Sequence, residues 1–334
     1  MNPTGITYCL LAQRFFPMKT VLYYIAVALL FVLNKLPLCV LHFFSTLLYY
    51  PMYYIVRYRR KVVRDNLVKS FPEKDLKEII AIEKKFYRNL CDYFMEMIKY
   101  YGMSEEKIKR YMRFEGLEKF HEAVDAGHSC VLYMGHIFNW EYVTSITLHF
   151  NREDTAVGAI YHPLENSRFD ALVKNMRAQF GTEAITMANT LRRIMQISKE
   201  GKKYVIGFIA DQVPTWESIN HWLDFFHRDT PVFTGTEKIA QRTHAALFYA
   251  HVHREKRGHY VLRIDKMADD AALLPEFEAT NMYYRLLSEN IREVPELWLW
   301  THNRWKRTRE GYARREAKRV EDRKKLVENS KKNV

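Results

Sequence analysis

Two apolar segments near the N-terminus constrain this chain more than any other feature. Residues 21–33 read VLYYIAVALLFVL, and after a break at 34–37 a second apolar run extends over 38–56. Each run is close to or below the roughly 20 residues that cross a bilayer as a helix, so a tilted spanning helix, a re-entrant hairpin and an interfacial anchor all stay open. No small-residue cleavage site follows the first run, which argues against a removable signal peptide. We therefore expect residues 1–56 to be a retained membrane anchor.

The anchor is flanked by unequal numbers of basic residues. Five of the eight residues at 57–64 are Lys or Arg, whereas only two basic residues precede the first apolar run. By the positive-inside rule, the body that follows the anchor lies on the cytoplasmic side. A basic residue directly before an apolar run is also typical of a start site. Met18 is therefore an alternative initiator, in which case residues 1–17 would be an upstream extension.

The body has the composition of a folded domain. The 334 residues are 48% apolar and 27% charged, which excludes both a disordered chain and a polytopic transporter. The four cysteines contain no Cys-x-x-Cys pair, so we expect reduced thiols rather than a disulfide framework. A single cytoplasmic domain is expected at residues 57–310.

Apolar runs and helical patterns alternate through this body. Residues 73–101 carry apolar side chains at three- and four-residue steps, which predicts one long helix. Strands are expected at 130–134, 156–161, 204–209, 246–253 and 260–267, with helices from residue 140 and over 167–180. The last two strands would form a hairpin around Arg257-Gly258. The alternation predicts an α/β sheet with helices on its faces.

Positive charge is concentrated at the C-terminus. The chain carries 52 Lys and Arg against 39 Asp and Glu, and residues 304–334 supply +8 of the net +13. The basic tail at 311–334 has two interpretations, a solvated helix or an electrostatic contact with anionic membrane lipids. Nucleic acid is not expected as a partner, because aromatic residues are not interleaved with the basic ones.

One histidine is a candidate for chemistry because of its position. His136 follows the predicted strand 130–134 after one glycine, and Glu141 lies five residues further on. Ligands of open α/β sheets bind beyond the carboxyl ends of the strands. A neutral imidazole there can take a proton from an attacking hydroxyl while a carboxylate orients the ring. A second pair with the same spacing, His149 and Asp154, falls at the end of a helical stretch, where a surface or capping histidine is expected.

Five sequence blocks in a fixed order give the His136 motif its context. They read GHIFNWE (135–141), YHPLENSRFD (161–170), ADQ (210–212), FFHRDTPVFTGTEKIA (225–240) and PELWLWTHNRWK (295–306). A basic segment with Arg59, Arg60, Asn66 and Leu67 precedes them. With these blocks, residues 19–310 resemble the bacterial lipid A biosynthesis acyltransferases, the late lauroyl and myristoyl acyltransferases.

The resemblance implies a bacterial inner-membrane enzyme with a glycerolphosphate-acyltransferase-like α/β fold, a mixed sheet flanked by helices, facing the cytoplasm. Such an enzyme moves a fatty acyl group from acyl carrier protein to a hydroxyl of a phosphorylated lipid A precursor. The resemblance also implies that His136 is the general base and Glu141 its orienting partner. Residues that would bind substrate phosphates or shape the site are Arg168, Asp211, Gln212 and Arg304. We expect no cofactor and no metal, because no cluster of His, Cys, Asp or Glu has ligand spacing.

The chain departs from the family pattern at two histidines. His162 stands where the family usually has arginine and His227 where it usually has glycine, and both are expected on surface loops. The missing arginine either leaves Arg168 as a replacement or points to a different glycolipid or an amino-acyl lipid as acceptor. A catalytically inactive membrane scaffold is the alternative outside enzymes. The retention of both His136 and Glu141 argues against it.

Two further segments have two interpretations each. Trp298, Trp300 and Trp305 face lipid or pack against the sheet. The loop at 213–221 covers an acyl channel or is a plain surface loop.

Overall fold

The structure is a computed structural model that describes residues 23–24, 27–151 and 153–332. The possible extension at 1–17 and part of the first apolar run lie outside these residues. Residues 27–35 are helical, and α2 (Leu38–Tyr50) continues directly into a π-helix at Pro51–Val56. Within the described part of the chain, Leu38–Val56 is the one helix long and apolar enough to cross a membrane, and 28% of an 18-residue apolar stretch within it is buried in the protein.

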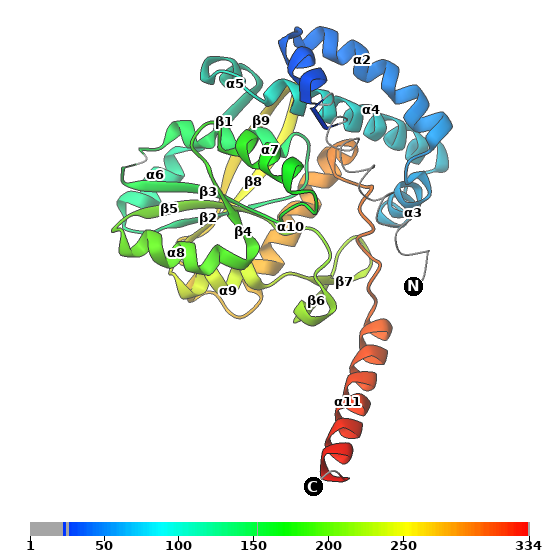
Figure 1. The fold of residues 1–334 in the computed structure, drawn as a ribbon, viewed down its shortest axis with the longest axis vertical. Coiled ribbons are helices and arrows are strands. Elements are labelled where there is room, and N and C mark those ends of the chain that lie inside the picture. The colour runs from blue at the N-terminus through cyan, green and yellow to red at the C-terminus, as the bar shows by residue number, and fades with distance from the viewer. Residues whose placement is uncertain (1–22, 25–26, 152, 333–334) are drawn as a thin grey trace, which may run out of the picture.

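A seven-stranded sheet forms the centre of the body (Figure 1). Its strand order is β1-β9-β8-β2-β5-β3-β4, and only β8 and β9 pair antiparallel. The strands are β1 (Met112–Glu115), β2 (Cys130–Met134), β3 (Thr155–Tyr161), β4 (Glu183–Thr186), β5 (Lys203–Ile209), β8 (Ala246–Lys256) and β9 (His259–Ala268). A separate antiparallel pair consists of β6 (His221–Asp224) and β7 (Asp229–Val232). The predicted mixed α/β class is confirmed.

The central strands are apolar because both of their faces are covered. All five residues of β2 are buried, as expected for a parallel strand with helices on either side. In Figure 1, helices surround the sheet and α10 lies along β8. The helices are α3 (Arg60–Ser70), α4 (Leu76–Tyr100), α5 (Glu105–Tyr111), α6 (Glu118–Asp125), α7 (Ser167–Ala178), α8 (Thr190–Lys199), α9 (Gly235–Arg242), α10 (Glu278–Glu293) and α11 (Arg309–Lys332).

The long predicted helix is α4, and it lies between α2 and the rest of the body. It begins at a capping box, in which Asp75 and Glu78 each accept a hydrogen bond from the other's backbone N–H. Its buried face packs against α2 on one side and against the segment after α10 on the other. By contrast, α11 projects away from the body (Figure 1), so the basic tail is helical and largely exposed.

The tryptophans near the C-terminal end of the body belong to the core. Trp298 and Trp300 are buried, and their rings meet edge to face with centroids 4.6 Å apart. Trp305 is half-buried and donates its indole N–H to the Thr230 hydroxyl over 2.8 Å. The packing interpretation therefore holds, and the lipid-facing one does not.

Candidate active site

His136 lies where the sequence predicts, directly beyond the carboxyl end of β2. The backbone passes close to α10 here, because a Cβ on Gly135 would come within 2.5 Å of the Leu287 side chain. A larger residue at position 135 would therefore require the Leu287 side chain to shift. His136 keeps a 16% exposed side chain, which gives one edge of its ring access to solvent or substrate.

Asp211 holds the ring of His136 in place from the end of the neighbouring strand β5. Its Oδ1 lies 2.5 Å from His136 Nδ1, and its Oδ2 accepts the His136 backbone N–H over 2.8 Å. The indole N–H of Trp298 donates to the same Oδ2 over 2.7 Å. A buried carboxylate with these partners fixes the tautomer that carries its proton on Nδ1 and leaves Nε2 as the acceptor.

The environment of Asp211 keeps this carboxyl group ionised. Burial acts to raise its pKa, but the charge and hydrogen bonds of His136, together with the Trp298 N–H, outweigh burial and lower the pKa from 3.8 to about 2. Nearby, burial lowers the pKa of His302 to about 4, so this second histidine is neutral at physiological pH. A stable charge on Asp211 suits a group that orients His136 and stabilises an imidazolium.

The depressed pKa of Asp211 predicts how stability depends on pH. A carboxyl group with a lowered folded-state pKa stabilises the fold above its ordinary pKa, here by about 2 kcal/mol, and this stabilisation disappears as the pH falls from about 4 to about 2. The difference in unfolding free energy between the unaltered protein and Asp211→Asn should therefore shrink on acidification from pH 6 to pH 3. Chemical denaturation at both pH values measures it, and a constant difference would contradict the prediction.

Glu141 has a different partner from the one its spacing suggests. It lies in the 3-10 helix Trp140–His149, is 2% exposed, and accepts hydrogen bonds from Arg177 Nε over 2.8 Å and from the terminal nitrogen Nη2 over 2.6 Å. The structure thus brings Asp211, not Glu141, to the Nδ1 of His136. The Trp140 ring connects the two groups, because it packs edge to face on His136 at 5.0 Å and donates its N–H to Glu141.

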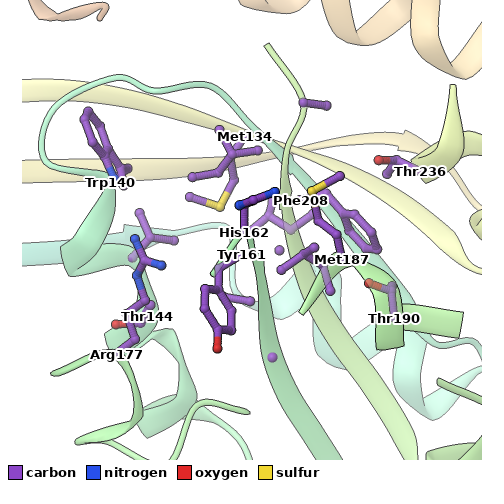
Figure 2. A pocket seen from close by; sticks show the side chains of 18 of the residues that line it. Met134, Trp140, Thr144, Tyr161, His162, Arg177, Met187, Thr190, Phe208 and Thr236 are labelled. Atoms are coloured by element: carbon purple, nitrogen blue, oxygen red, sulfur yellow. The ribbon is translucent and has the colours of Figure 1, made fainter. Parts of the chain in front are cut away.

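A pocket of about 730 Å³ opens beside His136. Its polar lining includes His136, Gln212, Glu141 and Arg177. Apolar side chains make up most of the remaining wall and come from β2, β3, β5 and the helices around them, including Leu132, Met134, Val143, Ile146, Val157 and Ile160. Figure 2 shows Trp140, Thr144 and Arg177 at one end of the view and Met187, Phe208 and Thr190 toward the other. The pocket therefore has a polar end with Arg177 and a mostly apolar wall.

The comparison with known protein families gives one match for this chain. Residues 12–307 match the family described as bacterial lipid A biosynthesis acyltransferase. The chain belongs to this family. No curated protein matches the chain.

The other residues implied by the family resemblance occupy different positions in this acyltransferase. Gln212 lies in the pocket, with its side-chain nitrogen 3.2 Å from His136 Nε2. Arg168 is exposed in the first turn of α7 and does not line the pocket. Arg304 is fully buried, where it donates to the Pro231 carbonyl and the Tyr284 hydroxyl. These contacts favour a role for Arg304 in shaping the site rather than in contacting a substrate phosphate.

The two histidines that depart from the family pattern are both exposed. His162 lies at the pocket wall, and its Nδ1 is 2.9 Å from the Pro163 carbonyl. His227 is in the turn between β6 and β7 with a backbone φ of 60°. The loop at 213–221 contributes Val213, Thr215 and Ser218 to the pocket. It is therefore part of the pocket wall rather than a plain surface loop.

One cluster of possible metal ligands could not be predicted from the spacing of residues in the sequence. His42, Asp92 and Glu96 lie on α2 and α4, and their ligand atoms are within 4.8 Å of one another. Each already has a protein partner: Arg257 binds Asp92, and His42 and Tyr260 bind Glu96 over 3.1 and 2.9 Å. These contacts make the cluster a polar connection between α2 and the body.

Arg177 is the site residue that sequence reasoning missed. It lies near the end of α7, 36 residues after Glu141, and no local pattern links the two. Burial acts to lower the pKa of Arg177, but the hydrogen bonds from Arg177 to Glu141 outweigh this and raise it above its ordinary value. Arg177 therefore keeps its positive charge beside Glu141 within a largely apolar pocket.

Proposed function

We propose that this acyltransferase moves a fatty acyl group from acyl carrier protein to a hydroxyl of a phosphorylated lipid A precursor, with His136 as general base. The observation that carries the proposal is the His136 ring, which buried Asp211 orients and which lines a mostly apolar pocket. A glycerolphosphate-acyltransferase-like fold is part of the proposal. An inactive scaffold has no need of such a contact and pocket.

The chemistry follows from the two nitrogens of His136. With Nδ1–H bound to Asp211, the Nε2 lone pair accepts the proton of the acceptor hydroxyl as its oxygen attacks the thioester carbonyl carbon. When the C–S bond breaks, the imidazolium returns this proton to the leaving thiolate. An ester and a free thiol result, and no serine or cysteine nucleophile is required. The side-chain amide of Gln212, close to Nε2, helps to position the incoming groups.

The apolar and charged parts of the pocket suit different parts of the acyl donor. The apolar interior suits the acyl chain, because burying methylene groups there contributes about 0.8 kcal/mol each. Arg177, fixed by Glu141, places a cation at the polar end, where charge develops on the thioester oxygen. We assign Glu141 to positioning Arg177 and Asp211 to orienting His136.

The cellular setting is also proposed. The apolar helix Leu38–Val56 and the lipid A pathway of the family support membrane association. We propose the bacterial inner membrane, with the catalytic domain in the cytoplasm, where acyl carrier protein is available. Anionic lipids, the phosphorylated acceptor and the acidic carrier protein all suit a chain with net charge +13. Exposed Arg168 is proposed to meet the acceptor phosphate.

Product mass tests the proposed function directly. The purified protein, offered a mixture of acyl carrier proteins and a lipid A precursor, should add one acyl group to the precursor. Mass spectrometry of the lipid product measures the addition, and free fatty acid in place of the loaded carrier protein should give none. Acylation of another glycolipid or an amino-acyl lipid instead would favour the alternative acceptors, and no product with any lipid would favour the scaffold.

A further inference from the structure

A second pocket opens between α2, α4 and the hairpin that joins β8 to β9. Its volume is about 450 Å³, and it shares no lining residue with the pocket beside His136. Strand β8 runs parallel to β2, so the end of β8 that carries Arg254 lies at the same edge of the sheet as His136. The second pocket is thus separate from the proposed active site but lies on the same edge of the sheet.

Positive charge dominates this pocket. Its basic side chains are Lys85, Arg88, Arg254, Lys256 and Arg257, and its acidic ones are Asp92, Glu255 and Glu296. Asp92 is neutralised by Arg257 at 2.5 Å, and Glu255 pairs with Arg113, which lies outside the pocket lining. The other four cations form no ion pair with a described residue. They face one unpaired carboxylate, that of Glu296, so the pocket attracts an anion.

One aromatic ring forms part of the pocket wall. Tyr49 is 2% exposed, and the Arg88 guanidinium lies 5.1 Å from the centre of its ring. A cation over an aromatic face is attracted by the electrons of the ring. The ring therefore helps to hold Arg88 at the pocket without an acidic partner, where it can meet an anion.

The surroundings indicate which anion fits. Ser45, Thr46 and Tyr49 of α2 line the pocket, while Phe43, Leu47 and Tyr50 of the same helix are exposed apolar side chains. A phosphate held in the pocket would leave attached acyl chains beside this apolar face. A concave pocket of this volume suits a small headgroup, whereas an acidic protein would need a broad surface.

We propose that this pocket binds the phosphate headgroup of an anionic membrane lipid. The inference rests on the membrane association proposed above. A lipid held there would fix α2 and the β8–β9 hairpin at the headgroup level. Because His136 lies at the same edge of the sheet, the bound lipid would also turn the catalytic pocket toward the bilayer that supplies the acceptor.

Native mass spectrometry of the detergent-purified full chain tests this site. With phosphatidylglycerol and phosphatidylcholine added in equal amounts, the unaltered protein should retain one phosphatidylglycerol in preference to phosphatidylcholine. Arg88→Glu should lose this preference. Lys77→Glu is the matched control, because Lys77 is an exposed cation on the same helix that does not line the pocket, and it should keep the preference. Lys256→Glu, an exposed change on the hairpin, provides a second variant if Arg88→Glu fails to fold.

Three outcomes would overturn the proposal. In the first, the unaltered protein retains neither lipid preferentially. In the second, the Lys77→Glu control loses the preference as fully as the pocket variants, which would indicate diffuse surface charge. Inorganic phosphate at the same concentration could also displace the lipid, which would indicate a site for free anions. No acyl donor or acceptor is present in this measurement, so its result stands apart from the test of acyl transfer.

Discussion

Replacing His136 with alanine should lower the rate of acyl transfer by a factor on the order of 10²–10⁴, the usual contribution of a general base. The variant loses the imidazole proposed to take the hydroxyl proton at the end of β2, while the apolar wall of the pocket proposed to hold the acyl chain is unchanged. The expected signature is therefore a fall in kcat with little change in the KM for the acyl donor. Lipid product formation under saturating donor measures the effect.

His149→Ala is the control for this experiment. His149 has an acidic residue at the same spacing, but it lies half-buried at the end of the 3-10 helix, with its ring 5.4 Å from Phe114 and outside the pocket. Its replacement should leave transfer close to the unaltered rate. A His136→Ala protein that transfers at a near-normal rate, or a His149→Ala protein that fails equally, would refute the assignment of His136 as base.

The central strands could be predicted because local sequence decides them. Cys130–Met134 is a continuous apolar run that ends at a glycine, and the β8–β9 hairpin turns at Gly258, whose φ is +79°. Strands β1 and β4 were missed. Each has four residues with charged or polar side chains among them and lies at an edge of the sheet, so pairing with a neighbouring backbone defines it rather than its own pattern.

The site was only partly predictable, for a related reason. The position of His136 follows from one strand and one glycine, which are local features. Its contact with Asp211 joins residues 75 positions apart and exists because β2 and β5 are adjacent parallel strands. Glu141 is near His136 in sequence, but the 3-10 helix that starts at Trp140 carries its carboxylate to Arg177 on α7. Spacing along the chain cannot predict a partner that another element supplies.

Replacing one partner of the Glu141–Arg177 ion pair should lower the unfolding free energy more than replacing any other contact residue in the site. The Glu141 side chain is 2% exposed and that of Arg177 is 21% exposed, so Arg177→Met leaves a buried carboxylate that still accepts the Trp140 N–H but has lost its cationic partner. Removing one partner of a buried pair typically costs about 3–5 kcal/mol, because the remaining charge is uncompensated. Glu141→Gln should cost less, since the arginine that remains can reach water through the pocket.

The double variant Arg177→Met/Glu141→Gln separates stability from catalysis. Because it removes both charges together, its unfolding free energy should recover most of the loss seen in Arg177→Met, and thermal unfolding in detergent across the four proteins of the cycle measures the coupling. Its acyl transfer should stay slow, since the cation at the polar end of the pocket is missing. Recovery of both stability and transfer would mean that the pair only holds the fold together, and additive losses would mean that the two side chains act independently.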